Sequence, residues 1–65
     1  MKVVLFADSL YIYCDSNDKQ ALIRYGDSSK FDYCGIDQGQ HLFIVKYPSY
    51  DFLYWLSCMF DYSIE

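Results

Sequence analysis

The chain has 65 residues and a formal net charge of −4, with nine acidic residues against five lysines and arginines. A chain of this length forms a single domain, which we expect to span residues 1–65 and to bury roughly 60% of the surface that the unfolded chain exposes. A negative field repels nucleic-acid phosphates and anionic membranes and attracts basic protein surfaces, so direct binding of nucleic acid or membrane is not expected.

Apolar residues make up 54% of the chain, including eight Tyr, five Phe and one Trp, and these large rings can form a core without disulfides or metal. The three cysteines (Cys14, Cys34 and Cys58) are an odd set, and the first residues lack the long apolar stretch of a secretory signal. The apolar runs at residues 3–7 and 42–45 are far shorter than the roughly 20 residues of a membrane span. We therefore expect a cytoplasmic protein.

Two strands are predicted at the start of the chain. Residues 2–8 carry β-branched and aromatic side chains on both faces, which is typical of a central strand covered on both sides. Residues 10–15 alternate instead, which predicts a strand with one buried face and one half-exposed face. The buried set is Leu10, Ile12 and Cys14, and the opposite set is Tyr11, Tyr13 and Asp15.

The segment after the second strand has two interpretations. Residues 15–19 have the polar composition of a turn, which makes residues 20–25 the return strand of a hairpin that ends at Gly26. Alternatively, a short helix begins at Asn17 or Asp18 and ends before Gly26, with this glycine as a left-handed cap. We prefer the strand and keep the helix as the alternative.

Two further strands are predicted after a turn at residues 26–29. They span residues 31–36 and 41–47, with a turn at residues 37–40 between them, and we expect antiparallel pairing because the loops are short. With a helix at the C-terminus, the predicted fold class is α+β. An antiparallel sheet of four to five strands carries one C-terminal helix packed on it.

The predicted C-terminal helix covers residues 48–65. Pro48 suits the first turn of a helix, and Ser49 and Asp51 favour the positive end of the helix dipole. At about 100° per residue, the apolar side chains fall on one arc, and the acids and most tyrosines fall on the other. The core arc holds Phe52, Leu53, Trp55, Leu56, Met59, Phe60 and Ile64, and the outward arc holds Tyr50, Asp51, Tyr54, Ser57, Cys58, Asp61, Tyr62 and Glu65.

No residue pattern of the chain indicates catalysis. The single histidine, His41, could activate Cys34 as a nucleophile, but no orienting or oxyanion motif accompanies this pair. We therefore predict that the protein is not an enzyme.

Metal and cofactor sites are not expected either. A zinc site would need all three cysteines and His41, and their spacings of twenty, seven and seventeen residues lack the close ligand pairs of structural zinc sites. A calcium loop starting at Asp15 would have Lys19 at a ligand position. The three glycines fit no phosphate-binding loop.

A platform of stacked rings for single-stranded nucleic acid is a further alternative for the sheet. Such sites combine rings with a basic groove, and the bases of this chain are scattered and outnumbered. We therefore interpret these rings as packing residues. They are Tyr11, Tyr13, Phe31, Tyr33 and Phe43.

An acidic and aromatic surface is the feature that we expect to carry function. Residues 48–65 contain three acids and no base, a net charge of −3, against a net charge of −1 in residues 1–47. Tyrosine offers broad contact area, and carboxylates beside it select a basic partner. The predicted partner-binding residues are Asp51, Tyr54, Asp61, Tyr62 and Glu65 on the helix, with Asp8, Tyr11, Tyr13 and Asp15 on the sheet.

In size, charge and lack of catalytic motifs, the chain resembles the small phage-encoded inhibitors of bacterial defence, among them anti-CRISPR proteins and DNA mimics. The resemblance covers overall composition and the acids Asp51, Asp61 and Glu65. It implies a non-enzymatic inhibitor that binds a basic protein surface and blocks nucleic-acid access to a bacterial immune complex by steric and electrostatic occlusion. The alternative is a homo-oligomeric structural or adaptor module, because a domain of this size cannot fully bury all its rings.

Overall fold

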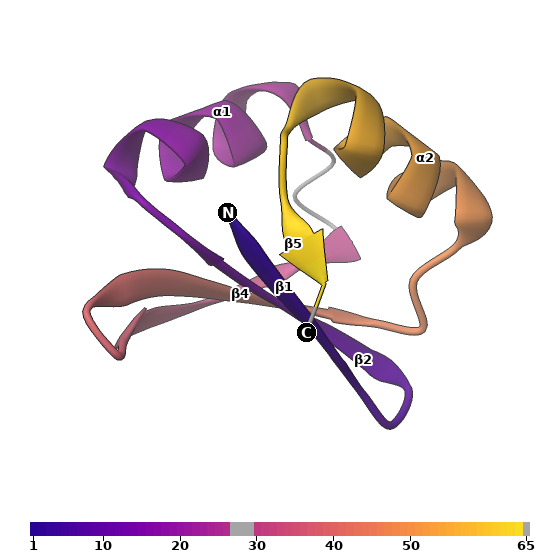
Figure 1. Cartoon of the computed structure of the whole chain (residues 1–65), viewed down its shortest axis with the longest axis horizontal. Coiled ribbons are helices and arrows are strands. Elements are labelled where there is room, and N and C mark those ends of the chain that lie inside the picture. Colours follow the sequence, from indigo (N-terminus) through magenta and orange to yellow (C-terminus); the bar gives the residue numbers. More distant parts are fainter. Residues whose placement is uncertain (27–29, 65) are drawn as a thin grey trace.

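The fold has two layers, a five-stranded sheet and a pair of helices that both lie on one face of it (Figure 1). The structure, a computed structural model, describes residues 1–26 and 30–64. The strands are β1 (Lys2–Phe6), β2 (Ser9–Cys14), β3 (Asp32–Asp37), β4 (Gln40–Lys46) and β5 (Ser63–Ile64), and the helices are α1 (Ser16–Tyr25) and α2 (Tyr50–Met59). The strand order is β3-β4-β2-β1-β5.

The α+β class and the antiparallel sheet of four strands are confirmed. β1 pairs with β2, β2 with β4 and β3 with β4, all antiparallel, and the short β5 pairs in parallel with β1. The predicted strands at residues 31–36 and 41–47 lie within one residue of β3 and β4. The turn between them holds Gln38 (φ 54°) and Gly39 (φ 78°) in the left-handed conformation that tight hairpins need.

The preferred return strand at residues 20–25 is wrong, and the alternative helix is present as α1. Asp15 is its N-cap, because one carboxylate oxygen accepts a hydrogen bond of 2.8 Å from the backbone N of Asp18. Leu22 is fully buried beneath the helix, which holds α1 on the sheet. The expected left-handed cap at Gly26 is also wrong, because its φ is −87°.

The C-terminal helix is confirmed, but it ends at Met59, and α1 makes it one of two helices. The backbone of Phe60 is extended (φ −137°, ψ 145°), and the chain then runs beside β1, where the backbone N of Ser63 donates a 3.1 Å hydrogen bond to the carbonyl of Met1. This pairing covers backbone groups that β1 would otherwise leave open at the sheet edge. The predicted helix is therefore wrong for residues 60–64.

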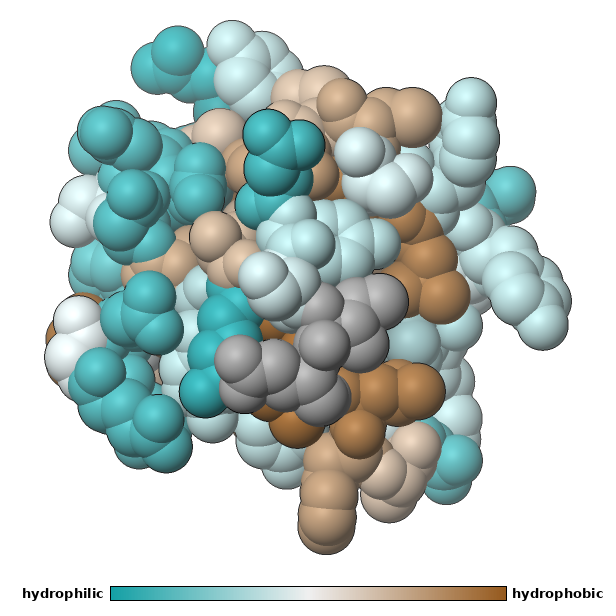
Figure 2. All heavy atoms as spheres, in the orientation of Figure 1, coloured by the Kyte–Doolittle hydropathy of each residue, from teal (hydrophilic) through white to brown (hydrophobic). Residues whose placement is uncertain are grey.

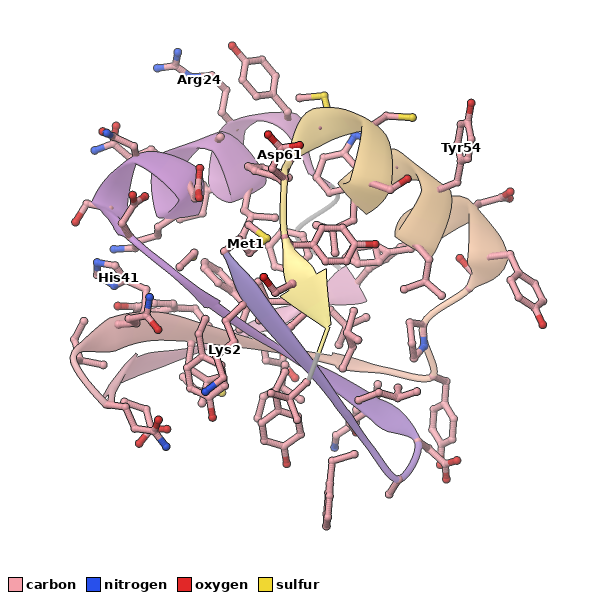
Figure 3. All side chains as sticks on the ribbon, viewed as in Figure 1. Met1, Lys2, Arg24, His41, Tyr54 and Asp61 are labelled. Carbon is pink, nitrogen blue, oxygen red and sulfur yellow. The ribbon has the colours of Figure 1, made fainter. Side chains whose placement is uncertain are left out.

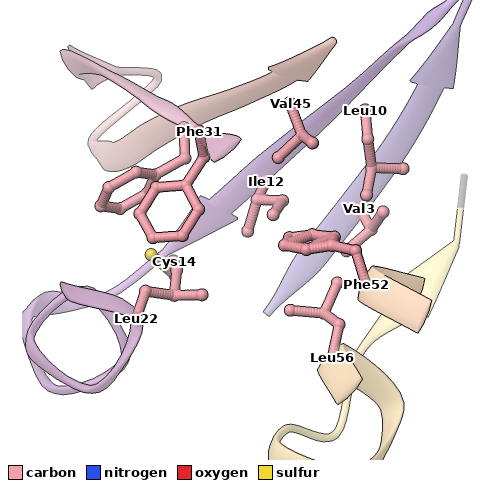
Figure 4. Packing of buried hydrophobic residues seen from close by; sticks show 10 residues of the cluster. Val3, Leu10, Ile12, Cys14, Leu22, Phe31, Val45, Phe52 and Leu56 are labelled. Atoms are coloured by element: carbon pink, nitrogen blue, oxygen red, sulfur yellow. The ribbon is translucent and has the colours of Figure 1, made fainter. Parts of the chain in front are cut away.

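The core lies between the sheet and the two helices (Figure 4). The predicted buried face of β2 is confirmed, since its three residues are at most 3% exposed. Aromatic rings join the two ends of this core, with the Phe31 ring centroid 5.4 Å from that of Phe43 and 6.4 Å from that of Phe52. The buried cluster is Val3, Leu10, Ile12, Cys14, Leu22, Phe31, Phe43, Val45, Phe52 and Leu56.

The opposite face of the sheet is not covered by any helix or strand of residues 1–26 and 30–64. Val3 is buried beneath the helices, whereas Phe6, which points to the other face of the same strand, is 68% exposed. The prediction that residues 2–8 form a strand covered on both sides is therefore wrong for the single chain, which covers only one side of the strand. An apolar sheet face remains open.

Candidate protein-binding surface

Two features of the sequence fix the outward side of α2. Ser49 caps the helix, because its hydroxyl oxygen accepts a hydrogen bond of 3.1 Å from the backbone N of Phe52. Phe52 and Leu56 are buried in the core, which leaves Tyr50 and Tyr54 90% and 72% exposed. Figure 3 shows Tyr54 directed away from the sheet into solvent.

Charge and a further ring extend this outward side. Asp51 is exposed and is the only charged residue of α2. Tyr47 is 77% exposed, and its backbone N donates a 2.8 Å hydrogen bond to the carbonyl of Asp8, which joins the β1–β2 turn to the start of α2. We call this set the α2 surface. It consists of Asp8, Tyr47, Tyr50, Asp51 and Tyr54.

The remaining predicted residues of the C-terminal segment do not lie on α2. Asp61 is exposed just beyond the end of the helix (Figure 3). Tyr62, which we predicted to face outward, is half-buried and packs against the core, because the chain has already left the helix at Phe60. The prediction for Glu65 lies outside the described residues.

Tyr11 and Tyr13 lie on the helix-free face of the sheet, away from α2. Alternation along β2 causes this, because its apolar residues point toward the helices. Tyr11 is half-buried, but Tyr13 is only 9% exposed, and the Nζ atom of Lys2 lies 5.4 Å from its ring centroid. Burial, a hydrogen bond to Asp37 and the charge of that carboxylate raise the pKa of Tyr13. The predicted continuity of these two rings with the helix surface is therefore wrong, as is the expected exposure of Tyr13.

Asp15 is exposed, but its carboxylate serves the fold as the cap of α1. We expect Asp15→Ala to lower the free energy of unfolding by about 1 kcal/mol, because the backbone N of Asp18 loses its acceptor. Asp15→Asn keeps an acceptor and should leave the stability nearly unchanged. Urea unfolding followed by circular dichroism measures both variants. Equal losses for the two would contradict a capping role.

Two hollows adjoin the start of α2, and lysines line both of them. The larger, of about 470 Å³, has Lys30, Lys46 and Ser49 in its wall, and the smaller, of about 230 Å³, has Tyr25, Lys30 and Asp51. Lys30 and Lys46 outnumber Asp32 in the larger hollow and so disfavour a basic side chain there, whereas Lys30 and Asp51 offset each other in the smaller one. Neither hollow is therefore strongly negative, and the candidate contact residues are the protruding side chains of the α2 surface.

Hydropathy also distinguishes the two ends of this face of the molecule. Strongly hydrophilic residues gather over α1 and the β3–β4 hairpin in Figure 2, whereas the α2 side carries residues of intermediate hydropathy with apolar ones between them. Bulk hydropathy does not by itself mark an interface, so the exposed tyrosines of α2 are the feature that points to protein binding.

His41 is held by hydrogen bonds from two elements. Its Nε2 atom lies 3.2 Å from the hydroxyl oxygen of Ser16 in α1, and its Nδ1 atom lies 2.8 Å from that of Tyr33 in β3. The conceivable pairing of His41 with Cys34 is not formed, since the Cys34 thiol donates to the backbone carbonyl of Asp32. Neither hollow described above is lined by Ser16, Tyr33 or His41. The cluster therefore ties α1 to the sheet.

The thiol of Cys14 is chemically quiet. Burial raises its pKa to about 11, and the negative charges of Asp18 and Asp15 act in the same direction. The nucleophilic thiolate is therefore scarce at neutral pH. In the part of the chain that the structure describes, no group of three metal-ligating side chains is found. Within the same residues, no helix combines the length and the apolar character that crossing a membrane requires.

No protein-family model matches the chain, and no curated protein and no solved structure does so either. The α2 surface and the apolar side of the sheet that the helices leave uncovered are therefore the observations that bear on function.

Two exposed rings of the α2 surface are absent from the predicted partner-binding residues. Tyr50 lies on the predicted outward arc and is more exposed than Tyr54, so helical periodicity alone could have selected it. Tyr47 follows the last residue of β4, and its φ of 52° directs it outward. That conformation depends on how the chain passes from the sheet to α2, which no local pattern indicates.

Proposed function

We propose that this protein is a non-enzymatic inhibitor whose α2 surface occupies a basic surface of another protein. The supporting observation is that Tyr50, Asp51 and Tyr54 are exposed together on one helix, and that residues 47–65 contain no base. Tyrosine is enriched among the residues that dominate binding energy. Carboxylates beside it accelerate the encounter with a basic surface and select against acidic ones.

The partner class that we propose is a nucleic-acid-binding effector complex of bacterial immunity, in line with the resemblance to small phage-encoded inhibitors. The groove of such a complex presents lysines and arginines that bind phosphates, and Asp8, Asp51 and Asp61 offer carboxylates to the same groups. A body of 28 × 25 × 22 Å seated there also blocks the groove sterically. Because the net charge is only −4, we assign much of the affinity to the rings.

The test measures binding of labelled target DNA by purified, guide-loaded CRISPR effector complexes as the protein is titrated in. We expect inhibition of at least one such complex. Replacing Asp8→Asn, Asp51→Asn and Tyr54→Ser together should raise the half-inhibitory concentration by about tenfold or more. These side chains are exposed, so circular dichroism should show a folded variant.

A charge-matched control separates the α2 surface from the net charge. Asp15→Asn with Asp18→Asn removes two carboxylates at the start of α1, and the asparagine at position 15 still caps the helix. This control should inhibit like the wild type. Equal loss in the control, full inhibition by the α2 variant, or no inhibition by the wild type would each contradict the proposal.

A further inference from the structure

The helix-free face of the sheet is lined by apolar side chains of its three central strands. Val4 of β1 lies beside Tyr11 of β2, and Tyr11 lies beside Ile44 of β4. Phe6, two residues after Val4 on β1, packs edge-on against Tyr11, with 6.4 Å between the ring centroids. We call this set the open sheet face. It consists of Val4, Phe6, Tyr11 and Ile44, together with Tyr13 and Leu42, which are only 9% exposed each.

Such a face is unusual for a sheet with only one covered side. Antiparallel sheets with one side in water alternate apolar and polar residues along each strand. Residues 3–6 of β1 and residues 42–45 of β4 are apolar on both sides. The two helices cover one side, and within the described residues nothing covers the other. The pattern is that of a sheet whose second face meets another chain.

We propose that the open sheet face is the contact surface of a homodimer, in which the sheets of two copies pack face to face. The charges at its rim identify a second copy as the occupant. Asp32 and Asp37 lie on β3 at one side of the sheet, and Lys2 lies on β1 toward the other side. With Lys46 as a second base, the border of this face carries two acids and two bases. Because these charges offset each other, the face does not favour a strongly charged partner.

Two-fold symmetry makes these charges complementary. An axis parallel to the strands, between β2 and β4, places β3 of each copy over β1 of the other. Lys2 then faces the partner's β3 between Asp32 and Asp37, each within about 7 Å along the strand, which is two residue spacings. Lys46 faces the partner's β2 at the row of Ser9, so no like charges meet there.

The size of the molecule agrees with this choice of face. A stable interface buries about 800 Å² on each partner, and the whole chain measures 28 × 25 × 22 Å. Most of one side of the molecule is therefore needed. The open sheet face is a whole side of the molecule with an apolar centre and a charged rim, which is the usual composition of such an interface.

Mass measurement by size-exclusion chromatography with light scattering tests the dimer, and it does not depend on the proposed function. We expect a mass twice that of the 7.7 kDa chain at a concentration of tens of micromolar. Phe6→Lys should give the single-chain mass, because it replaces a ring that is 68% exposed on this face by a charge that the contact would have to bury. Leu5→Lys is the matched control, since Leu5 is 60% exposed on the same strand but points to the other face. It should remain a dimer.

Folding of each variant is checked by circular dichroism, and Tyr11→Thr, which replaces one residue of high strand preference by another, is a second probe of the same face. A single-chain mass for the wild type even at hundredfold higher concentration would overturn the proposal. The same holds if Phe6→Lys and Leu5→Lys give equal masses, or if Tyr11→Thr leaves the dimer as tight as the wild type. Inhibition in the DNA-binding assay is measured separately, so loss of the dimer and loss of inhibition are distinguishable.

Discussion

Leu56→Ala is expected to lower the free energy of unfolding by about 2 to 5 kcal/mol. Leu56 is fully buried, and α2 contributes only this side chain and Phe52 to the buried part of the core. A chain of this length has a total stability of about 3 to 10 kcal/mol. The cavity that the alanine leaves would therefore remove a large part of the stability, and a substantial unfolded population at room temperature is expected.

Leu5→Ala is the matched control for this substitution. The two leucines lose the same atoms, but Leu5 is 60% exposed, so its truncation should change the stability by less than about 0.5 kcal/mol. Urea unfolding followed by tryptophan fluorescence measures both variants, since Trp55 packs against Phe52 with ring centroids 5.7 Å apart. Similar losses for the two variants would show that α2 is not docked as described.

Gly26→Ala is expected to lower the free energy of unfolding by about 1 to 3 kcal/mol, through overpacking and not through backbone strain. The φ of Gly26 is −87°, which any residue adopts. A β-carbon there would lie 2.5 Å from the carbonyl oxygen of Leu22 and 2.9 Å from Cε1 of Phe31. The backbone carbonyl cannot move aside without disturbing the last turn of α1, so we expect the end of the helix to shift.

Gly39→Ala provides the contrasting control. Nothing lies within 4 Å of a β-carbon at this position, but φ is +78°, so this substitution costs conformational strain alone, about 1 to 2 kcal/mol. Amide hydrogen exchange distinguishes the two variants. Gly26→Ala should weaken protection in α1, whereas Gly39→Ala should affect only the β3–β4 hairpin. A neutral Gly26→Ala would show that α1 does not approach Phe31 this closely.

Sequence patterns predicted correctly those features that short-range chemistry controls. The alternation at residues 10–15 predicted the buried face of β2, and the apolar spacing after Ser49 predicted α2 and its outward side, except that Met59 of the predicted core arc is 44% exposed. Both patterns depend on residues within a few positions of each other. Tyr54 and Asp51 were therefore identified as exposed from the sequence alone.

Features that long-range pairing controls were predicted less well. Residues 16–25 have only one side chain, Leu22, that reaches the core, so their pattern did not separate helix from strand. The placement of Tyr62 failed because the tail leaves the helix to pair with β1, which lies at the opposite end of the sequence. Local preference and sheet pairing differ by small free energies, and the pairing partner is invisible from the tail itself.

By itself, the amino-acid sequence determined the α+β class, the two faces of β2 and the outward side of α2, because each follows from side-chain periodicity within one element. Only the tertiary structure decided that Tyr11 and Tyr13 lie on the side of the sheet away from α2, that Asp8 joins the start of α2, and that one apolar sheet face stays uncovered. Periodicity states which side chains share a face, but the packing of helices on the sheet selects the face that they cover.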